Sequence, residues 1–327
     1  MKITVIGSGS FGTSLAMLLS NKGYDVTLYG RNEVQMKMIA ATRGNHKYLP
    51  GVFLPSDLKV SSDLEDAVRD RDLLVMAVPA QSFRSTAQKV SELTLTTPVI
   101  NVAKGLEIGT LKRMSEIAVE YFPDAEYACL SGPSHAEEVA RNLPTTVCVA
   151  SENGGFAKDV QKIFMNDHFR VYTNDDLVGV ELGGAIKNVI ALGCGISDGL
   201  GLGDNAKAAL ITRGIAEMTR LGVAMGGKPE TFAGLSGIGD LVVTCTSMHS
   251  RNRRFGILLG QGMPIEDALK KIGMVVEGYT TQEAAFELAQ KYNVEMPITF
   301  TMHRLFNGEI EAEECISILM GRKEKNE

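Results

Sequence analysis

The sequence lacks any excess of basic residues: 39 aspartates and glutamates outnumber 33 lysines and arginines, for a formal net charge of −6. Nucleic acids and anionic membrane surfaces select a basic face, so neither is expected as the main partner. The chain opens without a signal-peptide segment, and no uninterrupted apolar run is long enough to span a bilayer. We therefore expect a cytoplasmic protein without membrane insertion, in which any anion-binding site is local.

Cysteine is scarce, and the positions of the cysteine, histidine and serine residues argue against disulfide, metal and serine-nucleophile sites. The five cysteines are odd in number and widely scattered, which favours reduced thiols over a disulfide framework. Cys245 and His249 have i,i+4 spacing, but no third ligand is nearby, so no metal site is expected. Neither GLSGIG nor SGPSHA has the spacing of a hydrolase nucleophile elbow, so serine catalysis is not favoured.

The 327 residues, 44% of them hydrophobic, exceed one ordinary core and indicate two soluble domains. Residues 1–178 alternate short β-branched runs with amphipathic segments, which predicts the α/β class with a Rossmann-like, doubly wound parallel sheet. From residue 179 to 327 long helical patterns replace the strand signals and predict an all-helical domain. Ligands of such sheets bind beyond the carboxyl ends of the strands.

The stretch GSGSFG follows the first predicted strand and opens a helical segment, the context that a dinucleotide-binding turn requires. Gly7 suits the tight turn, Gly9 allows the pyrophosphate to approach, and Gly12 allows the helix to pack on the sheet. The start of the helix stabilises negative charge. The sequence therefore predicts dinucleotide binding.

The second predicted strand ends in Gly30 and Arg31, where an NAD-selective site usually has an aspartate or glutamate. We expect Gly30 to leave space and Arg31 to bind a 2′-phosphate, so that NADP(H) is accepted. The alternative is that Arg31 is an ordinary exposed residue and that Glu33 reaches the ribose.

Lys187 stands among small and apolar residues in GGAIKNVIA, with no carboxylate three or four positions away. Either its ammonium reaches water along an apolar surface, or it is held in a cleft as a proton donor. The cost of the neighbouring glycines to a helix favours the second interpretation, with Gly183 and Gly184 letting cofactor or substrate approach the lysine closely. Asp240 is either a helix cap or the partner of a buried cation.

Several stretches together resemble the NAD(P)-dependent glycerol-3-phosphate dehydrogenases of bacterial type over essentially the whole chain. They include GSGSFGTSLA, YLPGVFLP, NVAKGLE, SGPSHAEE, GAIKNVIALGCGISDGLGLGDNAKAALITRG, FAGLSGIGDLVVTCTS and SRNRRFG. The resemblance implies a Rossmann domain, a helical second domain, and reversible reduction of dihydroxyacetone phosphate to sn-glycerol 3-phosphate for phospholipid synthesis. It implies NADP(H) or NAD(H) as cofactor and is compatible with a homodimer.

The resemblance also implies roles for individual residues. Lys187 would be the catalytic lysine. Substrate contacts would come from Lys104, Gly132, Ser134, Lys187, Asp240, Ser250, Arg251 and Asn252. Cofactor contacts would come from Ser10, Phe11, Arg31, Lys104, Ala136, Arg251, Val275 and Glu277, besides Gly7, Gly9 and Gly12 of the turn.

Two rival functions stay open at this point. An NADP-dependent reductase of another small hydroxyacid would use the same two-domain plan, although the cluster Ser250–Arg251–Asn252 favours a phosphate over a bare carboxylate. A non-catalytic dinucleotide sensor would have no need of Lys187.

Overall fold

The structure, a computed structural model, describes residues 1–321, and these residues form two compact units. Unit 1 comprises residues 1–104 and 112–181, whereas the short segment 105–111 belongs with the residues from 182 onward in unit 2. The predicted division at residues 178 and 179 falls inside one long helix. It stays a prediction of where the dinucleotide-binding domain ends, and residues 322–327 of the predicted second domain lie outside the described part.

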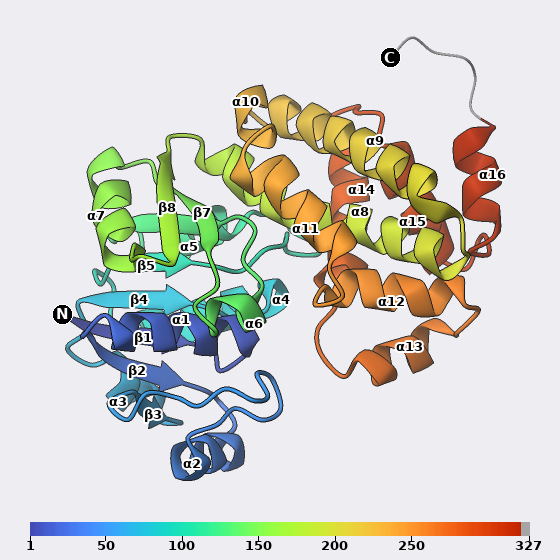
Figure 1. The fold of residues 1–327 in the computed structure, drawn as a ribbon. Coiled ribbons are helices and arrows are strands. Elements are labelled where there is room, and N and C mark those ends of the chain that lie inside the picture. Colours follow the sequence, from blue (N-terminus) through green and yellow to red (C-terminus); the bar gives the residue numbers. More distant parts are fainter. Residues whose placement is uncertain (322–327) are drawn as a thin grey trace. The chain divides into compact units, whose positions relative to one another are not determined.

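Unit 1 is built on one eight-stranded sheet with the order β3-β2-β1-β4-β5-β6-β7-β8 (Figure 1). Every neighbouring pair is parallel except β6 and β7, which run antiparallel. The strands are β1 (Lys2–Ile6), β2 (Asp25–Tyr29), β3 (Lys59–Ser61), β4 (Leu73–Met76), β5 (Val99–Asn101), β6 (Tyr127–Ser131), β7 (Thr145–Ala150) and β8 (Phe169–Asn174). The predicted α/β class with a Rossmann-like sheet is confirmed, and the antiparallel β6–β7 pair departs from an all-parallel sheet.

Strands β3 and β8 at the two edges were not predicted from the sequence. β3 has only three residues, and none of them is fully buried. In β8 only Phe169 and Val171 are buried, so the strand carries no continuous apolar run. The predicted strands are those with an apolar run, as expected for strands covered on both faces.

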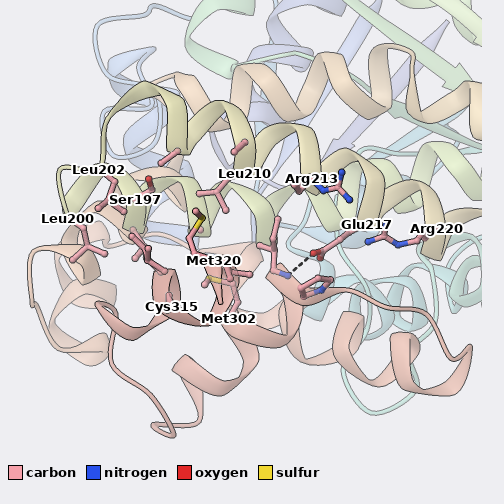
Figure 2. Close-up of a pocket in the computed structure, with 18 residues that line it drawn as sticks. Ser197, Leu200, Leu202, Leu210, Arg213, Glu217, Arg220, Met302, Cys315 and Met320 are labelled. Atoms are coloured by element: carbon pink, nitrogen blue, oxygen red, sulfur yellow. Dashed lines mark hydrogen bonds between the residues drawn. The ribbon is translucent and has the colours of Figure 1, made fainter. Parts of the chain in front are cut away.

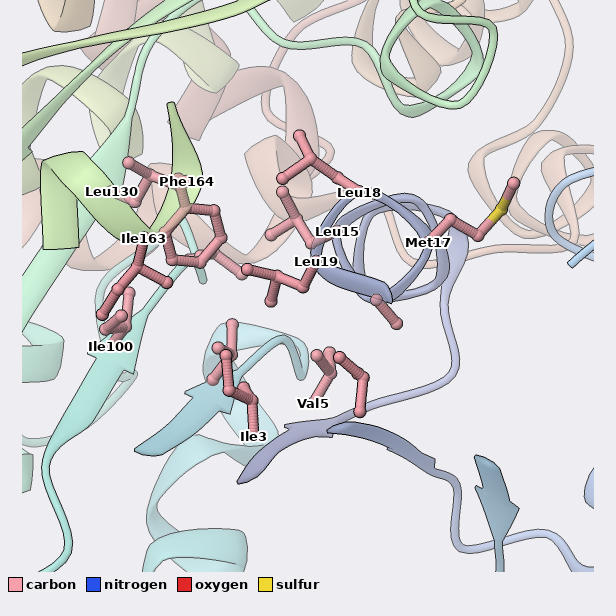
Figure 3. Close-up of a cluster of buried hydrophobic side chains, with 14 of the residues drawn as sticks. Ile3, Val5, Leu15, Met17, Leu18, Leu19, Ile100, Leu130, Ile163 and Phe164 are labelled. Atoms are coloured by element: carbon pink, nitrogen blue, oxygen red, sulfur yellow. The ribbon is translucent and has the colours of Figure 1, made fainter. Parts of the chain in front are cut away.

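Helices cover both faces of the sheet in unit 1, and alternate residues of each central strand face opposite layers. Ile3 and Val5 of β1 pack with α1 and α7 in one core, which Figure 3 shows beside Leu15, Leu19 and Phe164. Ile6 of the same strand belongs to a second core. The helices of this unit are α1 (Ser10–Asn21), α2 (Glu33–Thr42), α3 (Leu64–Val68), α4 (Ala80–Ser91), α5 (Met114–Tyr121), α6 (Ala136–Val139) and α7 (Gly154–Phe164).

The regular elements in the described residues of unit 2 are all helices, as predicted, and α8 (Leu177–Gly199) supplies its central helix. Val189, Leu192 and Ile196 of α8 form a core with residues of α12 and α15. The other elements are α9 (Gly203–Ala224), α10 (Pro229–Phe232), the π-helical turn η1 (Leu235–Gly239), α11 (Asp240–Thr246), α12 (Arg251–Gly260), α13 (Ile265–Ile272), α14 (Glu277–Lys291), α15 (Pro297–Phe306) and α16 (Glu314–Met320).

Helix α8 contains Glu181, Lys187 and Asp198, so it is not an uninterrupted apolar run, but it is the most apolar long helix of the described residues. Its 23 residues would suffice to cross a membrane by length and mean hydropathy. However, 94% of its most apolar window is buried inside the protein, so its composition is that of a core helix.

Candidate active site

The predicted site residues fall into two sets, one in each unit. In unit 1, Gly7 follows β1 with a φ of +122°, and a Cβ there would lie 2.3 Å from the carbonyl oxygen of Ala77. A Cβ on Gly12 would lie 2.0 Å from the carbonyl oxygen of Gly7. Only glycine fits at either position, because a side chain there would collide with backbone atoms.

Gly9 differs from the other two glycines because a Cβ built on it meets nothing within 4 Å. It is the N-cap of α1, and no side chain caps this helix, which begins with Ser10 and Phe11. The first N–H groups of a helix lack partners within the helix, and they attract anions. Open space in front of such a helix start fits a dinucleotide pyrophosphate, so the residues present suit the cofactor.

Arg31 and Gly30 follow β2, beside the glycine turn in the sheet. Arg31 is exposed, and Glu33 forms an ion pair with Lys37 at 2.6 Å, which lowers the pKa of the Glu33 carboxyl. A Cβ on Gly30 would lie 2.4 Å from Met36 Sδ and Ser8 Oγ. The expectation that Gly30 leaves space for a ligand is therefore wrong, since side chains of the protein fill that space.

Lys104, Gly132 and Ser134 lie together in unit 1. The Lys104 ammonium and the Ser134 hydroxyl both donate to the carbonyl oxygen of Gly132, each at 2.9 Å. Gly132 directly follows β6 and has a φ of +138°, which favours glycine. Ala136 is buried at the start of α6 nearby in the chain.

Lys187 is buried in unit 2, with 5% of its surface exposed, so its side chain does not extend into water. Its Nζ donates to Asp240 Oδ1 at 2.5 Å and to Thr244 Oγ1 at 2.8 Å. Thr244 in turn donates to the carbonyl oxygen of Asp240 at 2.6 Å. The structure therefore favours a buried ion pair over the surface interpretation of Lys187, and it makes Asp240 the partner of the cation. A buried lysine needs such a partner, because an unpaired buried charge is very costly.

Glycines set the distance between α8 and the segment that carries Asp240. A Cβ on Gly183 would lie 2.5 Å from the carbonyl oxygen of Ser236 in η1. This corrects the expectation that Gly183 leaves room for cofactor or substrate beside the lysine. The close approach instead brings the start of α11 against α8, where Asp240 meets Lys187.

The predicted phosphate site lies at the start of α12. The Ser250 side chain caps this helix by accepting from the N–H of Arg253 at 3.1 Å. Asn252 donates through Nδ2 to Asn188 Oδ1 at 2.8 Å and accepts from the N–H of Gly278 at 2.9 Å. Arg251 is the first residue of α12, so its guanidinium and the backbone donors of the first turn belong to one helix start.

The contact between Asn252 and Gly278 ties α12 to α14. Glu277 is the first residue of α14, and Val275, with 43% of its surface exposed, lies just before it. The structure thus brings most of the unit 2 candidates together around α8, α12 and α14.

Two residues of unit 2 were missed from the sequence: Thr244, which bonds Lys187, and Asn188, which bonds Asn252. Each had a signal: Thr244 lies four residues after Asp240 in a helical pattern, and Asn188 is the neighbour of Lys187. Cys245 follows Thr244, and a hydrogen bond between its thiol and Cys194, together with burial, raises the pKa of Cys245 well above its usual value. It stays a protonated thiol rather than a nucleophile.

A separate pocket of about 200 Å³ lies in unit 2 (Figure 2). Its walls come from α8, α9, α15 and α16, and Lys187 does not line it. Aliphatic side chains such as Leu200 and Leu210 dominate, and Glu217 lies toward the end where Arg213 and Arg220 are found. This pocket is not the predicted substrate site.

Comparisons with known proteins match the whole chain. The family model described as the N-terminus of NAD-dependent glycerol-3-phosphate dehydrogenase matches residues 2–157, and the model of its C-terminus matches residues 176–317. A relative from Bacillus mycoides, named glycerol-3-phosphate dehydrogenase (NAD(P)+), is 52% identical and covers 100% of this chain and 97% of its own length. A relative of the same name from Desulfitobacterium hafniense is 51% identical, with 100% and 93% covered. The crystal structure of glycerol-3-phosphate dehydrogenase from Coxiella burnetii superposes with a TM-score of 0.95, at 41% identity, over 98% of this chain and 99% of that one.

Proposed function

Because the chain belongs to the NAD-dependent glycerol-3-phosphate dehydrogenase family, we propose that Lys187 protonates the substrate oxygen when dihydroxyacetone phosphate is reduced. The chain is an NAD(P)-dependent oxidoreductase, and its reaction is the reduction of dihydroxyacetone phosphate to sn-glycerol 3-phosphate. When bound, the nicotinamide dinucleotide supplies the hydride. The roles of individual residues are our proposal, and the buried ammonium of Lys187 carries it.

Negative charge develops on the carbonyl oxygen of the substrate as the hydride adds to the carbon. A positioned ammonium stabilises that oxyanion and then gives it a proton, leaving a hydroxyl group on the product and a neutral amine on the enzyme. Asp240 and Thr244 hold the Lys187 Nζ in place through the bonds described above. In the reverse direction the neutral amine would accept the proton of the alcohol.

The substrate phosphate is assigned to the start of α12. Arg251 supplies a guanidinium, and the start of the helix adds partial positive charge. In unit 1, Lys104 and Ser134, which both bond the carbonyl oxygen of Gly132, are also assigned to the substrate, with the remaining ammonium hydrogens of Lys104 as donors and the Ser134 oxygen as acceptor. Gly7, Gly9 and Gly12 would hold the dinucleotide with Ser10 and Phe11, and Arg31 would meet a 2′-phosphate.

Arg251→Ala tests the phosphate assignment. Loss of a charge-assisted contact should raise the KM for dihydroxyacetone phosphate by roughly tenfold or more, with turnover followed as the loss of NADPH absorbance. The same variant should lose most of its preference over unphosphorylated dihydroxyacetone. Equal losses for the two substrates would remove Arg251 from the phosphate site.

We further propose that the protein works in the cytoplasm as a homodimer. The buried position of α8 supports the absence of membrane insertion. The net charge of −6 also disfavours an anionic membrane surface. Sedimentation of the purified protein would decide the assembly.

A further inference from the structure

The segment that contains YLPGVFLP has no role in the site described so far. It forms a loop, residues 43–58, that is closed on itself by backbone hydrogen bonds. The N–H of Leu54 donates to the carbonyl oxygen of Arg43 at 2.8 Å, and the N–H of Leu49 donates to that of Asn45 at 2.8 Å. The Arg43 guanidinium donates to the carbonyl oxygens of Pro55 and Leu58. Such a loop can hold a side chain in a fixed place.

Asn45 is the polar side chain that this loop directs into unit 1, and only 1% of its surface is exposed. Its Nδ2 donates to the carbonyl oxygen of Ser8 at 2.9 Å and to Thr13 Oγ1 at 2.8 Å. A carbonyl oxygen only accepts, so the amide nitrogen must face Ser8. Among residues 1–321 no group donates to Asn45 Oδ1, which indicates that the residue acts through its donors.

The two acceptors of Asn45 lie on either side of the open glycine. Ser8 stands between Gly7 and Gly9 in the turn, and Thr13 belongs to the first turns of α1, where its N–H donates to the carbonyl oxygen of Gly9 at 2.9 Å. Glycine restricts the backbone least of all residues, so a turn made of glycine and serine gains little rigidity from its own side chains. The Asn45 amide supplies a restraint from outside the turn.

We propose that Asn45 is a positioning residue for the dinucleotide. By bonding Ser8 and Thr13 it fixes the glycine turn relative to α1, so that the N–H groups at the start of the helix face the pyrophosphate together. Anion binding by backbone donors depends on that alignment, because each N–H must point at the same group. The inference rests on the proposed function in one respect, namely that the glycine turn binds the dinucleotide.

Asn45→Ala in the full-length protein tests the proposal, with NADPH binding measured by its fluorescence. Loss of the restraint should raise the Kd for NADPH by about tenfold, the effect of losing one or two buried hydrogen bonds. At saturating NADPH, kcat and the KM for dihydroxyacetone phosphate should stay within about twofold, because the substrate and proton-donor residues are not touched. A folded Asn45→Ala protein with unchanged Kd would overturn the inference.

Asn153→Ala is the control for loss of a structural asparagine elsewhere in unit 1. Asn153 also lies in unit 1 and also makes structural hydrogen bonds, since its Oδ1 accepts from the N–H of Gly155 at 2.9 Å and caps α7. It should lose stability and keep its affinity for NADPH. An equal loss of affinity in both variants would mean that Asn45 acts only through general stability, and would contradict the proposal.

A second pair of variants covers the case in which Asn45→Ala does not fold. Thr13→Val keeps the shape of the side chain and removes the acceptor, whereas Thr13→Ser keeps the acceptor. We expect Thr13→Val to weaken NADPH several-fold and Thr13→Ser to bind normally. Equal affinities would overturn the inference, whereas an unmodified protein that binds no NADPH would instead overturn the proposed function.

Discussion

A buried lysine is informative at the residue scale because its positive charge must be paired with another residue. Lys187 has no carboxylate three or four positions away on its own helix, and it forms its ion pair with Asp240 of α11. A pair of this kind is weak evidence for stability, since an apolar pair of the same volume often packs as well. Its presence beside Thr244 therefore fits a chemical role, in which the pair keeps an ammonium at a fixed position out of bulk water.

Arg31 is the residue that we propose distinguishes NADP(H) from NAD(H). Its guanidinium would bond the 2′-phosphate that only NADP(H) carries, and position 31 itself carries no carboxylate that would repel that group. Arg31→Ala should raise the Kd for NADPH by roughly ten- to a hundredfold and leave the Kd for NADH nearly unchanged.

Measuring the Kd values of Arg31→Ala for NADPH and for NADH side by side tests the assignment of Arg31 to the 2′-phosphate. Lys37→Ala is a control of similar charge, because that exposed lysine on α2 is paired with Glu33. It should leave both constants unchanged. A parallel rise for NADPH and NADH in Arg31→Ala would place the arginine at the part that the two dinucleotides share.

Close packing of α8 positions the Lys187 site at the element scale. Gly195 and Gly199 of α8 meet Gly256 and Gly260 of α12, so that a Cβ on Gly195 would lie 2.9 Å from Gly256 Cα. Gly183 likewise lets η1 pack closely against α8. Short distances between helices in this unit thus come from glycine, at a cost in helix propensity that the packing must offset.

Gly183→Ala should therefore damage the site without touching a catalytic group. The new Cβ must push η1 away from α8, which moves Asp240 relative to Lys187, so we expect kcat to fall about tenfold or more. Gly193→Ala on the same helix is the control, since its Cβ would meet Ile298 Cγ2 at an ordinary 3.6 Å.

Steady-state turnover and thermal unfolding of the two variants distinguish the outcomes. Gly193→Ala should keep its turnover and gain up to about 1 kcal/mol of stability from the better helix former. Full turnover in Gly183→Ala would show that the distance between α8 and η1 does not set the geometry of the lysine.

Stability of the whole molecule should depend on pH through Glu217, which lines the second pocket. This carboxyl is 1% exposed and accepts from the N–H groups of Ile298 and Thr299 at the start of α15. Burial raises its pKa to about 7, against the opposing effect of those hydrogen bonds. The folded protein therefore keeps this proton at a pH where the unfolded chain has lost it.

The free energy of unfolding should then fall as the pH rises from about 4.5, where the unfolded carboxyl ionises, to about 7. The contribution of this one group is on the order of 3 kcal/mol. Glu217→Gln should flatten that part of the pH profile, whereas Glu283→Gln on an exposed position of α14 should not. Urea unfolding of the unmodified protein and the two variants at pH 5 and pH 7 gives the change in the free energy of unfolding between these pH values. The same change in all three proteins would show that Glu217 does not hold the proton.

The sequence predicted the central architecture because the strands of unit 1 carry apolar runs and the glycine turn follows the first of them. Strands β3 and β8 escaped prediction, since edge strands with one buried face resemble loops. Lys187 was recognised as unusual from its neighbours, but its bond to Thr244 was not predicted, although Thr244 lies four residues after Asp240 in a helical pattern. The role of Asn45 could be identified only from the fold, because its contacts with Ser8 and Thr13 cross more than thirty positions of chain.

The most direct test of the account is turnover of dihydroxyacetone phosphate by Lys187→Arg and Lys187→Ala, with NADPH binding measured on the same samples. Lys187→Arg keeps a cation beside Asp240 and so protects the fold, but a guanidinium does not release its proton near neutral pH. We predict that kcat falls by about a hundredfold or more in both variants while the Kd for NADPH is retained. Near-normal turnover in either folded variant would contradict the assignment of Lys187 as the proton donor.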